Sequence, residues 1–184
     1  MQVIGIVGLP GSGKSEAAAV AREMDIPVVT MGDVVRAETA DRGLDPATDH
    51  GAVAQAMREE SGLAAIADRS LPIIEERLED ADVVLVDGIR SGHEVAVFED
   101  AFGEDFTLVE VFAPFDLREE RLADRGRDTG AEEGGESLED RDERERGFGM
   151  DEAIAAADVT IENTGTLESF RERVRSLLAE ERDP

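Results

Sequence analysis

The sequence feature that most constrains the fold lies close to the amino terminus. Residues 8–15 read Gly-Leu-Pro-Gly-Ser-Gly-Lys-Ser, a complete match to the pattern G-x-x-x-x-G-K-[ST]. The apolar run Val3 to Val7 precedes this segment, and a stretch with helical spacing, Ser15 to Met24, follows it. A buried strand, a glycine-rich turn and a helix in this order predict an α/β fold that binds phosphate groups at a helix amino terminus.

Each residue type in this loop meets a requirement of phosphate binding. Glycines allow the backbone to curl so that successive N–H groups point at phosphate oxygens. Lys14 is expected to reach the β- and γ-phosphates of ATP, and the Ser15 hydroxyl to complete the shell of a Mg²⁺ cofactor. Lys14 is the only lysine among 19 basic residues. The predicted ATP-binding residues here are Gly8, Leu9, Pro10, Gly11, Ser12, Gly13, Lys14 and Ser15.

Strand-like and helical segments alternate along the rest of the chain. The strand-like runs are continuous and rich in β-branched residues, which is typical of strands buried on both faces of a parallel sheet. Helical stretches such as Ser91 to Phe102 separate them. The rhythm predicts a single open α/β domain. Its predicted strands are Val3 to Val7, Pro27 to Thr30, Val83 to Val86, Leu108 to Phe112 and Val159 to Ile161.

Two regions break this rhythm. Residues 32–80 hold only helical patterns, which predicts a helical insertion that forms a flap over one end of the sheet. Residues 126–147 are rich in glycine and charge and contain almost no apolar residue except Leu138. We therefore expect a mobile surface lid there that contributes nothing to a core, with its acidic run 132–145 in solvent.

The charge of the chain excludes some functions. There are 45 acidic and 19 basic residues, a formal net charge of −26. At about 1 M salt the Debye length falls to about 3 Å, so this surface predicts a protein of a salt-rich cytoplasm. The same charge would repel nucleic acid. No run approaches the roughly 20 apolar residues of a membrane span.

Two classes of nucleotide-binding protein remain open. A GTPase needs an N-K-x-D segment with a second lysine, which the chain lacks. A large mechanochemical ATPase would need more than 184 residues. The remaining hypotheses are a compact kinase and a nucleotide-gated regulatory ATPase that has no small-molecule acceptor.

Three further segments favour the kinase. Residues 30–36, Thr-Met-Gly-Asp-Val-Val-Arg, resemble the T-G-D-x-x-R stretch of adenylate kinases. Residues 87–90, Asp-Gly-Ile-Arg, resemble their D-G-[FY]-P-R segment without its proline. Residues 157–168 are similar to the last strand and turn of dephospho-CoA kinases. The whole chain resembles an archaeal family of predicted P-loop nucleotide kinases related to both, with a haloarchaeal type of sequence.

This resemblance implies a three-layer fold with sheet order 2-3-1-4-5, and ATP and a small phosphate-bearing acceptor as partners. It implies that Arg36 and Arg90 hold the acceptor phosphate. Asp87 would sit in the magnesium shell, and Asp33 would orient or deprotonate the attacking group. Adenylate kinases place an adenine-reading glutamine soon after the second motif, where this chain has His93 and Glu94.

Local structure offers a second interpretation for most of these residues. Asp33 fits the N-cap of a helix that begins at Val34, Arg36 a solvated surface position, and Asp87 a turn before glycine. Residues 163–165, Asn-Thr-Gly, border either the donor base or a turn before a helix capped by Thr166. We therefore retain Asn163 and Gly165 as candidate ATP contacts.

Arginines near the predicted lid form the last group of candidates. Arg118, Arg121 and Arg125 are spaced i, i+3, i+7 and share one helical face. Arg121 and Arg125 look like the arginines at the start of kinase lids and are the candidate catalytic cations. Surface ion pairs with interleaved acidic residues are the alternative. His50 and His93 lack a second ligand at metal spacing, which favours structural roles.

Overall fold

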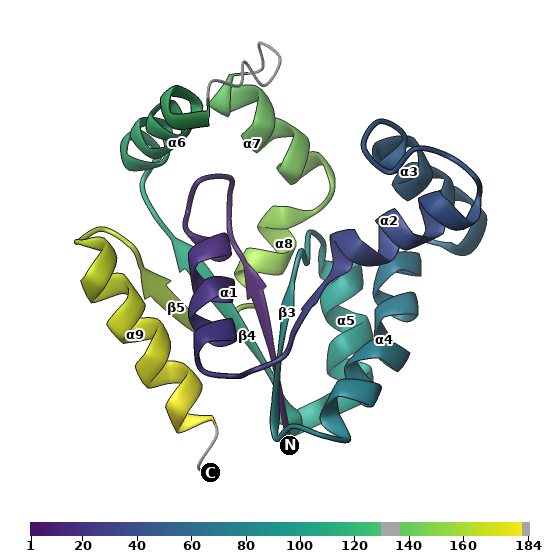
Figure 1. The fold of residues 1–184 in the computed structure, drawn as a ribbon, viewed down its shortest axis with the longest axis horizontal. Helices are drawn as coiled ribbons and strands as arrows, with labels where there is room; N and C mark the ends of the chain where they lie inside the picture. The colour runs from purple at the N-terminus through teal and green to yellow at the C-terminus, as the bar shows by residue number, and fades with distance from the viewer. Residues whose placement is uncertain (130–136, 182–184) are drawn as a thin grey trace.

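A parallel sheet stands at the centre of the molecule, between two layers of helices (Figure 1). The computed structural model describes residues 1–129 and 137–181, and the side chains of residues 1–124 and 137–181. In this part the sheet order is β2-β3-β1-β4-β5, which confirms the predicted fold class and order. The strands are β1 (Gln2–Val7), β2 (Val28–Thr30), β3 (Val83–Asp87), β4 (Phe106–Phe112) and β5 (Val159–Glu162).

Each face of the sheet buries its own set of side chains. Alternate residues of a strand point to opposite faces. Ile4 and Ile6 of β1 therefore pack on one face with helices α1 (Lys14–Glu23) and α9 (Leu167–Glu180). Val3 and Val7 pack on the other face with α4 (Ala65–Leu78), α5 (Gly92–Phe102) and α8 (Met150–Ala155). Burial on both sides explains why β1, β3 and β4 read as continuous apolar runs. The expectation is wrong for β5, which lies at the sheet edge and buries only Ile161.

The carboxyl ends of the strands meet at one edge of the sheet, where the conspicuous motifs gather. In the strand register Asp87 lies beside Ile6 of β1 and beside Thr30 of β2. Around this edge stand α2 (Met31–Asp41) and α3 (His50–Ser61) on one side, and α6 (Phe115–Thr129) and α7 (Leu138–Gly147) on the other (Figure 1). A short 3-10 turn, η1 (Gly103–Asp105), leads into β4.

The helical insertion differs in part from the predicted flap. Residues 32–80 do form helices only, but α4 lies along the sheet and not over its end. Ala65, Ile66 and Ile74 of α4 are buried in the core. Helices α2 and α3 stand at the end of the sheet, whereas the apolar face of α4 forms part of a helix layer on the sheet.

The predicted lid also differs in its described half. Leu138, Asp142 and Glu145 of α7 are all buried, so the prediction that this segment stays out of the packed structure and in solvent is wrong for these residues. Residues 130–136 lie outside the described part of the chain. In the described ranges, no helix has the length and apolar character to cross a membrane.

Candidate nucleotide and acceptor site

The loop of residues 8–15 has a backbone that only glycine accommodates at its key turns. Gly8 has φ 149° and Gly13 has φ 120°. A Cβ on Gly8 would lie 2.4 Å from the Val111 carbonyl oxygen, and one on Gly13 would lie 2.5 Å from the Asn163 Nδ2 atom. Helix α1 begins at Lys14, immediately after this turn. The loop therefore presents a helix amino terminus, where anions are favoured.

Lys14 is half-buried beside the loop and lines the cavity next to it. Its ammonium group donates hydrogen bonds to the carbonyl oxygens of Gly8 and of Leu9, the latter at 3.2 Å. Burial lowers the pKa of Lys14 below its usual 10.5, while the negative charges of Asp87 and Glu145 act in the opposite direction. The only lysine of the chain is thus held beside the curled backbone.

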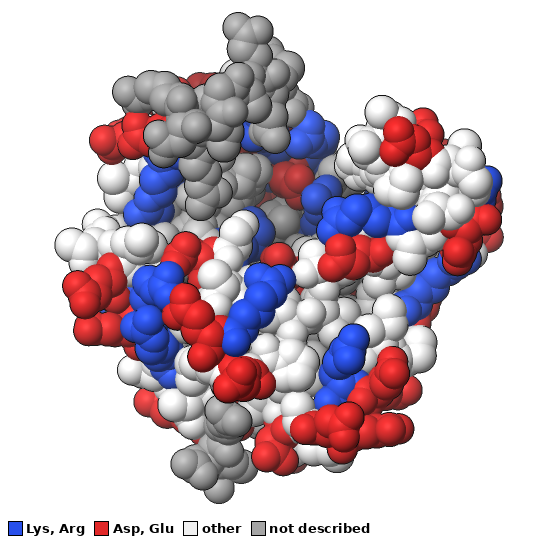
Figure 2. Space-filling view, viewed as in Figure 1, with Lys and Arg blue, Asp and Glu red and all other residues white. Residues whose placement is uncertain are grey.

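A cavity of about 870 Å³ opens between the loop and helices α2, α3 and α7. Figure 2 shows the molecule hollowed at this place, with basic side chains gathered around the hollow. Lys14 and Ser15 line it from the loop, Arg36 from α2, and Asp87 and Arg90 from the end of β3. Five predicted site residues from three distant motifs therefore meet around one cavity.

Asp87 and Lys14 line the same cavity, and their opposite charges interact. Burial raises the pKa of Asp87, and the charge of Lys14 opposes this shift. Mg²⁺ prefers hard oxygen ligands and is usually held by one or two protein oxygens together with substrate phosphates. The Ser15 hydroxyl and the Asp87 carboxylate, which both line the cavity, are a donor set of this kind.

Asp33 lies at the edge of the site. Helix α2 begins at Met31 and its N-cap is Thr30, so the N-cap interpretation of Asp33 is wrong. The Asp33 side chain is 68% exposed and forms an ion pair with Arg36. Asp33 thus contacts a residue of the cavity wall and belongs to the first turn of α2.

Asn163 ties the end of β5 to the loop. Its Nδ2 donates to the Ser12 carbonyl oxygen at 2.8 Å, and Arg121 Nη2 donates to the Asn163 carbonyl oxygen at 2.8 Å. Thr166 caps α9 by accepting a hydrogen bond from the Ser169 N–H, so Gly165 lies in the predicted turn before the helix. The side chain of Arg125 lies outside the described residues.

Two buried polar atoms lie in residues beside this hydrogen bond between Asn163 and the loop. Ser12 Oγ and Arg121 Nη1 have no hydrogen-bond partner in the described part of the chain. Buried polar atoms are usually hydrogen-bonded. Ser12 belongs to the loop and Arg121 to the neighbouring α6, so each is a candidate contact for a ligand bound there.

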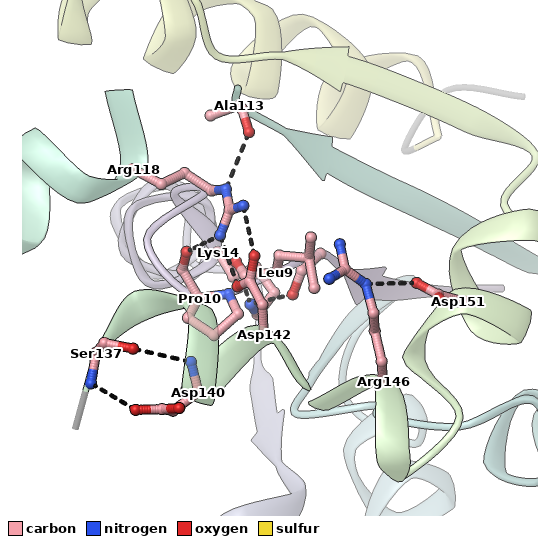
Figure 3. Close-up of polar contacts among 11 residues, drawn as sticks. Leu9, Pro10, Lys14, Ala113, Arg118, Ser137, Asp140, Asp142, Arg146 and Asp151 are labelled. Atoms are coloured by element: carbon pink, nitrogen blue, oxygen red, sulfur yellow. Dashed lines mark hydrogen bonds and ion pairs between the residues drawn. The ribbon is translucent and has the colours of Figure 1, made fainter. Parts of the chain in front are cut away.

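Arg118 is the central residue that sequence reasoning undervalued (Figure 3). Its guanidinium donates to the carbonyl oxygens of Ala113 at 3.1 Å and Pro10 at 3.0 Å. It also donates to both oxygens of Asp142, at 2.8 and 2.7 Å, and only 3% of Arg118 is exposed. One buried arginine therefore joins α6, α7 and the phosphate loop.

Sequence reasoning also missed several charged residues of the cavity wall. Glu94 is 1% exposed and accepts a hydrogen bond from the Arg90 N–H at 2.8 Å. Burial raises the pKa of Glu94. Arg58 of α3 lies 3.8 Å from Glu94. His50 and Arg58 lie at the two ends of α3, and both line the cavity. The wall also includes Arg141, Arg144 and Glu145.

The two histidines occupy different places. His50 lines the main cavity, and its Nδ1 lies 3.1 Å from the Pro46 carbonyl oxygen, to which it can donate. His93 lines a neighbouring cavity. In the described part of the chain, no group of three or more histidine or acidic side chains is arranged to hold a metal ion.

The solved structures with a similar fold include kinases of small molecules. The Thermus thermophilus protein TT1252 matches with a TM-score of 0.65 and 25% identity, over 97% of both chains. A Sinorhizobium meliloti gluconokinase matches with a TM-score of 0.59 and 17% identity, over 99% of this chain and 94% of its own. A shikimate kinase from Acinetobacter baumannii matches with a TM-score of 0.56 and 15% identity, over 100% and 96%.

Relatives found by sequence share more identical residues with this chain than the solved structures do. Residues 7–139 match a family profile described as an AAA domain. A UPF0200 protein of Halobacterium salinarum is 62% identical over 97% of this chain and 93% of its own length. A UPF0200 protein of Methanothrix thermoacetophila is 51% identical over 98% of each chain. These matches confirm the predicted archaeal family and its haloarchaeal type: the chain belongs to the UPF0200 family and has a P-loop kinase-like fold.

Proposed function

We propose that this protein is an ATP-dependent phosphotransferase that acts on a small, phosphate-bearing, nucleotide-like acceptor. The observation that carries the proposal is the distribution of charge around one cavity. Lys14 and Ser15 line it from the phosphate loop, and Arg36 and Arg90 line it from other elements. Two separate sets of phosphate-binding groups around one space suit two anionic substrates that exchange a phosphoryl group.

Phosphoryl transfer requires mainly positioning and charge neutralisation. The loop amides and Lys14 hold the β- and γ-phosphates, while Arg36 and Arg90 hold the acceptor phosphate. Ser15 and Asp87 would hold Mg²⁺, which would supply positive charge to neutralise the phosphate oxygens. Asp33 orients the acceptor side through its ion pair with Arg36.

The donor nucleotide extends toward Arg121 and Asn163. The unpartnered Ser12 Oγ and Arg121 Nη1 support this direction, because both are buried beside the loop. Arg121 and Arg125 neutralise charge on the transferred group, and Asn163 and Gly165 border the donor. The charged side chains of α7 that line the cavity complete its enclosure on this side.

The direct test is a coupled assay of ADP release at high KCl. The intact protein is given MgATP with each nucleoside monophosphate in turn, and with dephospho-CoA. We expect one acceptor to raise ADP release about tenfold or more above the rate with MgATP alone. If no acceptor raises the rate, the kinase proposal fails. Slow ATP hydrolysis that responds to no acceptor would instead favour a nucleotide-gated regulatory ATPase.

A further inference from the structure

A second cavity, of about 600 Å³, adjoins the first on the side away from the phosphate loop. Arg58, Arg90 and Phe148 line both cavities and form their shared wall. Leu63 and Arg146 line only the second one. A ligand that extends past these three residues would therefore occupy both cavities.

The second cavity is rich in cations, although acidic residues dominate the chain. Arg58, Arg90 and Arg146 line it, with Glu152 as the acidic side chain of its lining. The ion pairs of these arginines are long: 3.8 Å to Glu94, 3.5 Å to Glu145 and 3.3 Å to Asp151. Charge-assisted hydrogen bonds are usually about 2.7–2.9 Å long. The three guanidinium groups thus retain capacity to bind an anion.

Apolar side chains stand next to these cations. Leu63 is 56% exposed and Phe148 is 40% exposed, and both line the second cavity. The Arg58 guanidinium lies over the Phe148 ring, 5.3 Å from its centre. Apolar surface left exposed beside polar groups is typical of a binding site. The lining therefore suits a ligand that is anionic at one point and apolar at the next.

We propose that the second cavity holds an arm of the acceptor, so that the acceptor is a nucleotide with a diphosphate-linked arm. The diphosphate lies along the shared wall, where Arg58, Arg90 and Arg146 bind it. The arm packs on Phe148 and Leu63. This inference rests on the proposed function, and it selects an extended acceptor over a compact one that fills the first cavity alone.

Arg146 provides the test, because it lines the second cavity only and its ion pair with Asp151 is visible in Figure 3. Calorimetry at high KCl measures the binding of AMP and of dephospho-CoA, which carries a diphosphate and an arm. We expect the unaltered protein to bind dephospho-CoA at least about tenfold more tightly than AMP. Arg146→Ala should weaken dephospho-CoA binding about tenfold and change AMP binding less than about twofold.

The matched control is Asp151→Asn, which disrupts the same ion pair and leaves the guanidinium in place. It should bind dephospho-CoA at least as tightly as the unaltered protein. Equal affinity for both nucleotides, no binding of either, or equal losses in Arg146→Ala and Asp151→Asn would each overturn the extended acceptor. Failure of the kinase proposal has a different signature, because ADP release then stays at the ATP-only rate whichever nucleotide binds.

Discussion

The two sides of the main cavity hold their charged groups in different ways. On the donor side, Arg118 is buried and Lys14 is half-buried, and both donate hydrogen bonds to backbone carbonyl oxygens. On the acceptor side, the Arg36 and Arg90 side chains are 49% and 48% exposed, and each forms an ion pair with one carboxylate. One side is fixed by the fold, and the other is held by contacts that water can replace.

This difference separates stability from binding. Removing one partner of a buried ion pair leaves an uncompensated charge in the interior, whereas exposed pairs contribute little to the free energy of unfolding. In the proposed reaction the donor side would bind ATP and release ADP, and the acceptor side would release the phosphorylated acceptor. Substitutions on the donor side should therefore affect folding or turnover, and those on the acceptor side the acceptor KM.

The largest effect should come from Arg118→Ala. This variant leaves Asp142 buried without its cation and removes the hydrogen bond to the Pro10 carbonyl oxygen. We expect the free energy of unfolding to fall by about 3–5 kcal/mol, as for other broken buried pairs. Denaturant unfolding at high KCl measures this change.

The control for this prediction is the acceptor-side pair. Arg36→Ala breaks the exposed ion pair with Asp33 and should change the free energy of unfolding by less than about 1 kcal/mol. Similar losses in Arg118→Ala and Arg36→Ala would show that the two sides of the cavity do not differ in the way described.

Lys14→Ala should reduce turnover without a matching loss of the folded state. The ammonium group supplies positive charge where the transferred phosphate gains negative charge, and removal of one such group typically costs about 100-fold or more in rate. ADP release in the presence of the best acceptor measures the effect. An unchanged rate would mean that the loop does not bind the donor in the proposed way.

Much of the fold could be predicted because its signals are local. The loop motif fixes a strand, a turn and a helix, and the β-branched runs mark strands buried on both faces. Helix α4 shows what such local signals cannot predict. Its apolar stripe indicates only that one face is buried, and a stripe does not say whether a sheet face or another helix covers it.

The site could be predicted where a motif fixes it, and not where distant elements assemble it. Lys14, Asp87 and Arg90 occupy short motifs beside strand ends and do line the cavity. The pairing of Arg118 with Asp142 joins residues 24 positions apart, across a segment whose charges all look solvated. The sequence placed Glu94 only beside the second motif, because its burial depends on the helices packed around it.

Substitutions on the acceptor side should change the KM for the acceptor. Arg36→Ala should raise the acceptor KM about tenfold, the usual loss for one hydrogen bond to a charged group, and leave the MgATP KM within about twofold. Asp33→Asn keeps the cation and loses the ion pair, so its acceptor KM should rise less. Initial rates at varied acceptor and at varied MgATP separate the two constants. A rise in the MgATP KM alone would assign Arg36 to the donor.

The smallest effect should be a pH dependence of MgATP affinity, which arises from Lys14 on the donor side. Burial lowers the pKa of Lys14 below 10.5, so its ammonium loses the proton at a lower pH than an exposed lysine would. The charged form binds phosphate, so MgATP affinity should fall as pH is raised from about 8 to about 10, beginning at a lower pH than an exposed lysine would give. In Lys14→Arg the guanidinium stays charged over this range, so its affinity, whatever its value, should stay constant. Calorimetric titrations at each pH measure both proteins, and an equal decline in both would assign the pH dependence to groups other than Lys14.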